Sequence, residues 1–301
     1  MSLRKRVLKV TIGLPSGNIV LDETLNMKVR IHKTALSIQN KATIEVSNLA
    51  TTVRKELLSN LSAWQQKQRD QFGNPATVWP VTIEAGYIDA SGASTVATIY
   101  VGETVVSSLA APPPDITLRL ECMTHQVDKT TWVTEPSPDS MRFRDLVIWA
   151  ADKMGIPEAQ VICQTSHDDE IIQNPARSRL VASSILPYIQ DYYHPNVVAT
   201  IDDNFLIVTD RDKAIQPNDI VQLNEFIGIP TWTEYGMEAE ILLNTGVRVA
   251  KAVNLTSIMN PTLNGGFVVM ELDYDLTTRE TPFYVKVSGI PPAATTAAPS
   301  T

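Results

Sequence analysis

Four histidines are the residues of this chain best suited to proton transfer or metal binding, and they are scattered along it. None of them lies in an HExxH or His-x-His pattern. A hydrolase or a zinc site would need such groups, or a nucleophile and its base, within reach of one another. We therefore expect His32, His125, His167 and His194 to be surface or structural residues.

The run His167-Asp168-Asp169-Glu170 is the segment best able to attract a divalent cation, because carboxylate oxygens suit calcium and magnesium. It lacks the glycine and the distal glutamate that an EF-hand loop places at fixed positions. A solvated loop is therefore expected here. The acidic segments Asp202-Asp203-Asn204 and Asp273-Tyr274-Asp275 are interpreted as turns or strand edges, where charge discourages unwanted pairing.

Other common chemical motifs are missing from the sequence. Gly265-Gly266 is followed by neither a lysine nor a helix pattern, which excludes a Walker-type phosphate loop there. The 5 tryptophans are spread along the chain, whereas a sugar-binding face would gather several of them. The sequence therefore predicts no catalytic residue, no bound cofactor and no metal site, and we do not expect an enzyme.

Composition and charge narrow the class of protein further. The chain has 301 residues, enough for two or three domains, and only 19% of them are charged. The formal net charge of -8 disfavours specific nucleic-acid binding, which needs clustered lysine and arginine. The basic run Arg4-Lys5-Arg6 is expected to be a solvated segment. Low charge leaves neutral surface that an assembly can bury.

Segments that would direct the chain to or across a membrane are not found in the sequence. The N-terminus has a charged start without the apolar region of a signal peptide. No run approaches the roughly 18 apolar residues of a membrane helix. Cys122 and Cys163 lie in apolar surroundings and are expected to be buried thiols in a reducing compartment. We therefore expect folding in the cytoplasm, without export and without a membrane anchor.

The first part of the chain has the pattern of antiparallel strands. From Val7 to Val46 apolar and polar residues alternate, which is typical of half-buried strands. In residues 50–68 the apolar residues instead recur every three or four positions, which predicts one amphipathic helix. Strands resume at 81–87, 96–102 and 115–122. A β-rich first domain is the expected result.

The middle of the chain predicts both helices and strands. One helical stripe runs from Phe143 to Met154. A second helix is expected to begin near Asn174-Pro175 and to be kinked or split at Pro187. Residues 197–209 predict a β-hairpin with an acidic turn. An α+β region is therefore expected between two β-rich parts.

The C-terminal elements follow one another in an order that resembles the barrel of phage tail baseplate hub proteins. Leu243-Asn244 and Gly246 precede a valine strand. Asn264-Gly265 is expected to form a turn. The strand expected after it contains an aromatic residue followed by valines and runs into Asp273-Tyr274-Asp275.

The N-terminal and middle parts resemble the same family. One strand ends in Asn48-Leu49, a later one contains Ala85-Gly86-Tyr87, and a third ends near Gly102. The helix pattern Phe143-Arg144-Asp145-Leu146 is also similar to that of hub proteins. The ordered combination of these pieces, more than any one of them, carries the resemblance.

The resemblance implies an α+β, mainly β chain with two antiparallel β-barrel domains and an α+β middle region. Residues 1–125 would form an N-terminal barrel with an inserted helix, 126–230 the middle region, and 231–290 a C-terminal barrel. Residues 291–301 are expected to be a flexible tail, because their composition cannot bury a core. The positions expected to shape the barrel turns are Asn48, Leu49, Gly86, Tyr87, Gly102, Gly236, Gly246, Asn264, Gly265 and Gly289.

The function that the resemblance implies is structural. A homotrimeric ring would join the sixfold tail tube to the threefold central spike and line the DNA channel. Expected partners are further copies of the chain, the central spike, the tail tube or distal tail protein, and baseplate wedge proteins. The C-terminus of the tape-measure protein is a further candidate. The expected location is the baseplate of the virion tail, after assembly in the host cytoplasm.

Two alternatives stay open at this point. A cell-wall or carbohydrate-binding module of a tail-associated protein, built on the middle region, would be a monomer that binds murein. The sequence also leaves open whether the particle is a contractile tail, a non-contractile tail or a tailocin.

Overall fold

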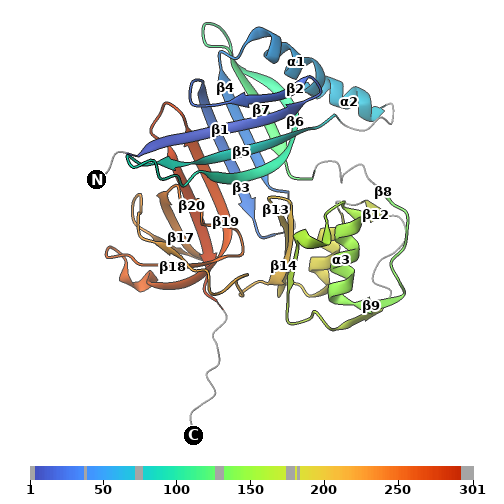
Figure 1. Ribbon diagram of the computed structural model, residues 1–301. Helices are drawn as coiled ribbons and strands as arrows, with labels where there is room; N and C mark the ends of the chain where they lie inside the picture. Colours follow the sequence, from blue (N-terminus) through green and yellow to red (C-terminus); the bar gives the residue numbers. More distant parts are fainter. Residues whose placement is uncertain are drawn as a thin grey trace.

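The structure, a computed structural model, describes residues 4–36, 39–71, 77–125, 132–173, 180–181 and 184–292. Within them, strands from both ends of the chain form one sheet of 13 strands, and a smaller α+β region lies beside it (Figure 1). The strands of the large sheet are β1 (Lys5–Leu14), β2 (Gly17–Leu21), β3 (Asn26–Thr34), β4 (Lys41–Ser47), β5 (Trp79–Ile88), β6 (Ala97–Ala111), β7 (Thr117–Met123), β15 (Val221–Leu223), β16 (Thr231–Thr233), β17 (Gly236–Leu242), β18 (Ala252–Leu255), β19 (Gly265–Thr277) and β20 (Phe283–Ile290).

The sheet joins the first and last parts of the chain through the pairing of β19 with β3. Its order is β16-β17-β20-β19-β3-β4-β7-β6-β5-β1-β2, with β18 also beside β19 and β15 beside β18. The antiparallel register of β19 and β3 runs from Glu271↔Thr34 to Thr277↔Lys28, while β20 occupies the other side of β19. The inward side chains of both parts therefore belong to one hydrophobic core.

Period-two alternation explains why these segments form a sheet with one buried face. In β3, Met27, Val29 and Ile31 are buried, whereas Arg30 and His32 are exposed. The expectation of a mainly β chain is confirmed. Two closed barrels are not seen among the described residues, because the strand order runs from β16 to β2 and joins both parts in one open sheet.

Two helices cover one end of the sheet. α1 (Thr51–Leu61) and α2 (Ala63–Gln71) replace the single helix expected over 50–68. The break lies at Ser62, whose backbone is extended and whose hydroxyl oxygen accepts a hydrogen bond from the backbone N–H of Gln65. Serine is a favoured N-cap, so this residue ends one helix and begins the next. Leu57 and Leu61 fix α1 against the core.

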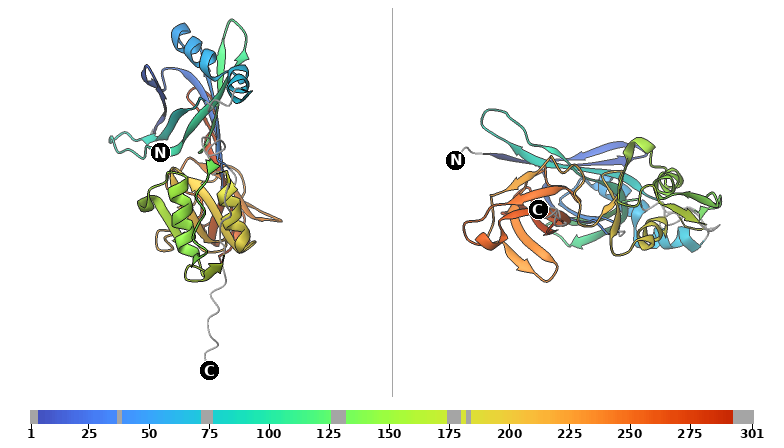
Figure 2. Two further views of the ribbon diagram at one scale, coloured as in Figure 1. Left: turned by 90° about the vertical axis from the view of Figure 1, so that its right-hand side faces the viewer. Right: turned by 90° about the horizontal axis from the view of Figure 1, so that it is seen from below.

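The middle region has its own hydrophobic core. Figures 1 and 2 place it beside the C-terminal strands, at the end of the molecule away from α1 and α2. Its sheet has the order β10-β14-β13. The helices and strands of the region are β8 (Trp132–Val133), β9 (Ser140–Arg142), α3 (Phe143–Lys153), β10 (Val161–Gln164), β11 (Ile171–Gln173), β12 (Leu180–Val181), α4 (Ile185–Tyr192), β13 (Val197–Asp202) and β14 (Phe205–Asp210), with a 3-10 helix at Glu158–Gln160. In the C-terminal part, a 3-10 helix lies at Pro261–Leu263.

The helix from Phe143 and the hairpin from Val197 are confirmed, but the second predicted helix is wrong in its start. Its helical residues begin at Ile185, and Leu180-Val181 instead form β12, paired with β8. Pro187 neither kinks nor splits α4, because it is the third residue of the helix, where its missing N–H would have no partner in the helix. Asn174-Pro175 lies outside the described residues.

Two expectations about the chain as a whole can be compared with the structure. No helix among the described residues is long and apolar enough to cross a membrane. Both cysteines are buried, as expected, and burial raises the pKa of the Cys122 thiol to about 12. That thiol therefore stays protonated and unreactive. The predicted flexible tail, 291–301, lies outside the described residues from position 293 onward.

Candidate functional site

A group of charged side chains, two of them buried and two partly buried, lies where the three parts of the chain meet. Lys33, near the end of β3, is only 1% exposed. Its ammonium donates to Asp202 and, at 2.9 Å, to Asp203, both at the turn of the β13–β14 hairpin. Arg248, from the loop before β18, forms an ion pair with the other carboxylate oxygen of Asp203. We call these four residues the junction cluster.

The junction cluster carries two cations and two carboxylates, so its charges balance. Burial opposes the charge of the Lys33 ammonium, but Asp202 and Asp203 outweigh that effect and raise the pKa of Lys33 above its ordinary value. Burial also raises the pKa of the nearby Tyr274 to about 12, so its hydroxyl stays neutral. Because buried charges need partners and hydrogen bonds, the cluster holds its members in one geometry.

Neutral hydrogen bonds fasten the same hairpin to the large sheet. The side-chain amide of Asn40 donates to the carbonyl oxygen of Ile201 at 2.9 Å. The hydroxyl of Thr200 donates to the carbonyl oxygen of Thr34 at 2.8 Å. Asn40 and Thr200 are both buried. The middle region is therefore attached to the sheet by a polar joint in addition to the chain connections at its two ends.

Lys33 belongs to none of the motifs found in the sequence. The alternation of buried and exposed residues in β3 nevertheless indicates that its side chain points inward. Met27, Val29 and Ile31 point inward, and a further step of two residues places Lys33 on the same face. Lysine is almost never fully buried unless it is paired. An inward lysine on a strand therefore implies a buried acidic partner elsewhere in the chain.

The acidic segments interpreted as turns or strand edges have different outcomes. The turn at Asp202-Asp203-Asn204 is confirmed, with φ of 46° at Asp203 and 68° at Asn204. The interpretation of Asp273-Tyr274-Asp275 is wrong, because these residues lie within β19, between β3 and β20. Tyr274 is buried and the two aspartates lie on the opposite, solvent-facing side. A central antiparallel strand with one face exposed to solvent shows the same alternation of acidic and apolar residues as an edge strand.

The run His167-Asp168-Asp169-Glu170 forms a loop whose side chains stabilise the loop itself. The Nδ1 atom of His167 lies 2.8 Å from a carboxylate oxygen of Glu170, and the ring stacks on Tyr193 with centroids 3.8 Å apart. The Tyr193 hydroxyl donates to Glu170 at 2.7 Å. Asp168 accepts hydrogen bonds from the backbone N–H and the hydroxyl of Thr165. These carboxylates are thus engaged within the loop.

The ten positions expected to shape turns lie in several places, and the structure brings two of them together. Gly236, at the start of β17, lies against Gly289 of β20, and a Cβ on Gly236 would overlap the carbonyl oxygen of Gly289. A Cβ on Gly86 would lie 2.6 Å from the carbonyl oxygen of Thr95. Close backbone approach therefore requires glycine at both positions.

Tyr87, another of these positions, connects the two ends of the chain. Its hydroxyl donates to the carbonyl oxygen of Phe283 at 3.3 Å, and its ring meets the Phe283 ring edge-on with centroids 5.4 Å apart. The guanidinium of Arg6 lies 5.3 Å from the centroid of the same ring. N-terminal strands β1 and β5 thus contact β20 directly, in addition to the pairing of β3 with β19.

The other positions are local. Asn48 has a positive φ of 57°, and its side-chain amide donates to Asp115 at 3.1 Å. The side-chain oxygen of Asn264 accepts a hydrogen bond from the backbone N–H of Ser257 at 2.7 Å. A role in shaping a barrel stays a prediction for all ten. The remaining residues are Leu49, which is buried, Gly102 in β6, Gly246 in the loop after β17, and Gly265 at the start of β19.

We expect Gly236→Ala to lower the free energy of unfolding by about 1–3 kcal/mol, because its φ of 137° and the contact with Gly289 both disfavour a side chain. Urea denaturation measures the loss. Gly17→Ala is the matched control, since Gly17 has a φ of 128° but open space around its Cβ position. Equal losses in the two variants would show that the contact with Gly289 contributes nothing.

Exposed apolar side chains gather around the edge strand β16. The side-chain amide of Asn260 donates to the carbonyl oxygen of Pro230 at 3.0 Å, which holds the loop before β19 next to β16. β16 ends the strand order, so its outer edge has no partner strand in the described part of the chain. An apolar surface beside a free strand edge is suited to contact with another protein. This surface, the β16 patch, consists of Ile229, Trp232, Ile258 and Met259, all exposed, with Ile258 at 94%.

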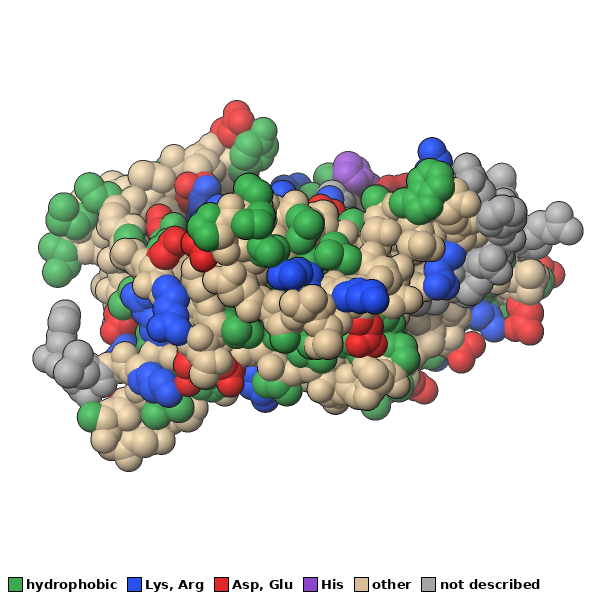
Figure 3. Space-filling view, turned by 90° about the horizontal axis from the view of Figure 1, so that it is seen from above, with side chains coloured by type: hydrophobic (Ala, Val, Ile, Leu, Met, Phe, Trp, Pro, Cys, Tyr) green, Lys and Arg blue, Asp and Glu red, His purple; other side chains and the backbone are tan. Residues whose placement is uncertain are grey.

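The face seen from the α1 and α2 end of the molecule is different in character. Figure 3 shows hydrophobic side chains there in small groups, with basic and acidic side chains between them. A surface with interspersed charges of both signs resists non-specific association.

Solved structures with a similar fold include tail proteins and a component of the type VI secretion system. The 43 kDa tail protein of prophage MuSo2 from Shewanella oneidensis is 10% identical, with a TM-score of 0.57 over 95% of this chain and 98% of that one. A tail protein from Neisseria meningitidis MC58 is 9% identical, with a TM-score of 0.55 over 94% and 96% of the two chains. The E. coli c3393 protein, a component of the type VI secretion system described as similar to T4 bacteriophage tail proteins gp27 and gp5, is 8% identical, with a TM-score of 0.52 over 89% and 74%. At these identities the likeness shows a shared fold.

The sequence itself also matches one protein family. A search of curated proteins gave no match. A family model described as "Baseplate hub gp41" matches residues 7–289, which is nearly the whole chain. The protein therefore belongs to the baseplate hub gp41 family.

Proposed function

We propose that the chain is the structural hub of a phage tail baseplate, and that three copies form a ring between the tail tube and the central spike. Membership of the baseplate hub family and the tail-protein fold support the role in the baseplate. The ring would present sixfold pseudo-symmetry to the tube and threefold symmetry to the spike, and so adapt one symmetry to the other.

The observation that carries the ring is the β16 patch. Its four apolar side chains are exposed in the single chain, and in the described part of the chain only Trp232 among them makes a ring contact with the core, edge-on to Phe267. A cyclic assembly uses head-to-tail contacts, in which one surface of each subunit meets a different surface of the next. Tryptophan is enriched among residues that dominate such interfaces, so Trp232 is the expected anchor.

We further propose that residues 1–125 and 231–290 are two barrel-like halves and that 126–230 is the middle region between them. The separate core of the middle region, built from residues 133–208, supports a middle unit, and β15 within 126–230 connects that unit to the large sheet. The large sheet ends in the free edges of β16 and β2, and contacts between subunits at such edges would complete the barrel-like wall.

The proposed ring would surround a channel through which DNA passes. A formal net charge of -8 per chain repels phosphates, which suits a channel that must not retain DNA. The proposed partners are the central spike, the tail tube or distal tail protein, and baseplate wedge proteins, with the tape-measure C-terminus as a further candidate. The virion tail is the proposed location, after assembly in the host cytoplasm.

Native mass spectrometry of the purified protein, alone and with its spike and tube partners, tests the ring. We expect a trimer that Trp232→Lys disrupts, because loss of an interface hot spot of about 2 kcal/mol or more weakens each contact by roughly 30-fold or more. Trp64→Lys is the matched control, since Trp64 is also an exposed tryptophan but lies on α2, away from the β16 patch.

Two results would count against this proposal. A wild-type chain that stays monomeric even with spike and tube proteins would reject the ring. A trimer that survives Trp232→Lys but is lost in Trp64→Lys would place the subunit contact elsewhere. A monomer that binds murein in a pull-down would instead favour the cell-wall-binding alternative.

A further inference from the structure

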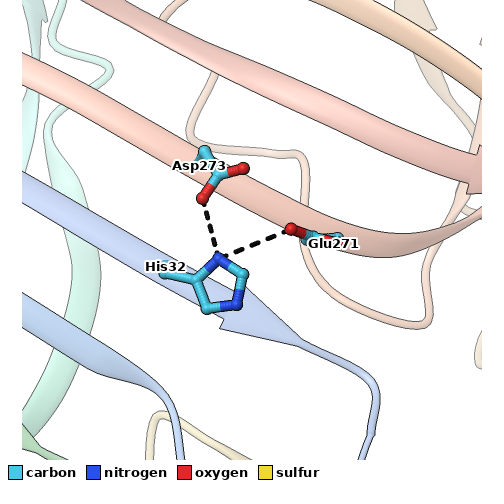
Figure 4. Close-up of side chains that lie close together, drawn as sticks. All are labelled: His32, Glu271 and Asp273. Atoms are coloured by element: carbon cyan, nitrogen blue, oxygen red, sulfur yellow. Dashed lines mark hydrogen bonds and ion pairs between the residues drawn. The ribbon is translucent and has the colours of Figure 1, made fainter.

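Three potential metal ligands meet on the outer face of the sheet, at the seam between β3 and β19. The Nδ1 atom of His32 lies 2.8 Å from a carboxylate oxygen of Asp273 and 3.5 Å from one of Glu271 (Figure 4). All three potential ligand atoms lie within 4.8 Å of one another. Two neighbouring strands thus direct one imidazole nitrogen and two carboxylate oxygens to a common point.

Strand pairing fixes this arrangement before any ion arrives. His32 is directly opposite Asp273 in the β3–β19 register, and Glu271 is two residues from Asp273 on the same face of β19. The residues on either side of Asp273, Leu272 and Tyr274, point the other way and are buried in the core. Because β19 is also paired with β20, the backbone below the three side chains lies inside a sheet. Sites on such strands hold their ligands more accurately than sites on loops.

We infer that His32, Glu271 and Asp273 bind a divalent transition-metal ion, Zn²⁺, at this seam. A tetrahedral zinc ion with bonds of about 2.1 Å separates its ligand atoms by about 3.4 Å, which matches the 3.5 Å between the imidazole nitrogen and Glu271. The 2.8 Å hydrogen bond from the imidazole to Asp273 would open by about 0.6 Å to admit the ion. Two carboxylates and a neutral imidazole together also neutralise the dication. The imidazole ligand distinguishes the site from one for calcium or magnesium, which prefer oxygen.

The surroundings leave room for the ion and for further ligands. The side chains of His32, Glu271 and Asp273 are 45%, 42% and 42% exposed, so water can complete the coordination. Lys286, the nearest lysine by register, forms its ion pair with Glu238 at 2.9 Å. Among the described residues, His32 is the only basic side chain within ion-pair distance of Glu271 or Asp273, while Lys286, opposite Asp273 in the β19–β20 register, acts on both carboxylates from a longer distance. Zn²⁺ would therefore replace two weak, exposed contacts with coordinate bonds across the seam.

The consequence is an inorganic link between the two ends of the chain. β3 and β19 are far apart in sequence, and the ion would join them on the outer face, opposite the junction cluster. Since Zn²⁺ would bind the folded sheet and not the separated strands, it should raise the unfolding temperature in a concentration-dependent way.

The test uses the full chain without a histidine tag, first stripped of metal. Isothermal titration with ZnCl₂ and native mass spectrometry are expected to show one ion per chain. His32→Gln and Asp273→Asn should each weaken binding by at least about tenfold. Co²⁺ should give the visible absorption of a tetrahedral site in the wild type and lose it in both variants. His167→Gln is the matched control, since His167 also lies 2.8 Å from a glutamate oxygen.

Several outcomes would overturn the inference. The inference fails if the wild type binds no Zn²⁺. It also fails if His32→Gln binds Zn²⁺ as tightly as the wild type, or if His167→Gln weakens binding as much as His32→Gln does. Either of these last two results would indicate an adventitious ion only. Circular dichroism checks that the variants are folded, as expected for exposed positions. Binding is counted per chain, so this result is independent of whether a ring forms.

Discussion

Replacing Lys33 with methionine should lower the free energy of unfolding by about 3–5 kcal/mol, the cost of breaking a buried ion pair by removing one partner. Methionine keeps most of the volume, so little of the loss comes from a cavity. What is lost is the charge that holds Asp202 and Asp203 inside the joint between the hairpin and the sheet. Urea denaturation, followed by circular dichroism, measures the change.

A lysine on the surface of the same sheet supplies the control. Lys9 forms an ion pair with Glu84 at 2.6 Å, but both side chains are partly exposed. Lys9→Met should therefore cost at most about 1 kcal/mol. Similar losses in the two variants would mean that burial of Lys33 has no energetic role. Adding Asp202→Asn to Lys33→Met should recover part of the stability, because it removes the unpaired charge.

Phe283→Ala should have an effect of similar size, about 3–5 kcal/mol, because a fully buried aromatic ring is removed and the surrounding strands cannot close the space. The ring contacts Tyr87 of β5 and the guanidinium of Arg6 of β1. Its removal therefore loosens the packing of the N-terminal strands on β20. Thermal unfolding by calorimetry measures the loss.

Phe205→Ala is the matched control, since Phe205 is 40% exposed at the start of β14. We expect a much smaller loss there. If the two alanine variants unfold at the same temperature, the contact between the ends of the chain contributes nothing beyond the pairing of β3 with β19.

Local structure was predictable where neighbouring residues decide it. The helix from Phe143 has an apolar stripe, and the hairpin from Val197 has two apolar runs around an acidic turn, so the structure agrees with both. The error at Pro187 has the same origin, because a proline is disruptive inside a helix and harmless in its first turn. The sequence pattern placed the helix start too early and so placed the proline in the interior.

Pairing between distant strands was not predictable in this way. Alternation says which face of β3 is buried, but it does not say that Glu271 of β19 will lie opposite Thr34. The trio of His32, Glu271 and Asp273 depends on that pairing, and the junction cluster likewise depends on contacts between segments that are distant in sequence. His32 was correctly expected to be a surface or structural residue, whereas its two acidic neighbours come from another part of the chain.

The position of β19 late in the chain has a consequence for synthesis on the ribosome. Thr277 pairs with Lys28, yet the two are made at opposite ends of the translation of this chain. At an elongation rate of roughly 5–20 residues per second, β19 is synthesised on the order of ten seconds or more after β3. During that time the free edge of β3 is a template for pairing with other nascent chains. We expect the charged and polar side chains of Lys28, Arg30 and His32 to protect the unfinished protein against aggregation at this stage of synthesis.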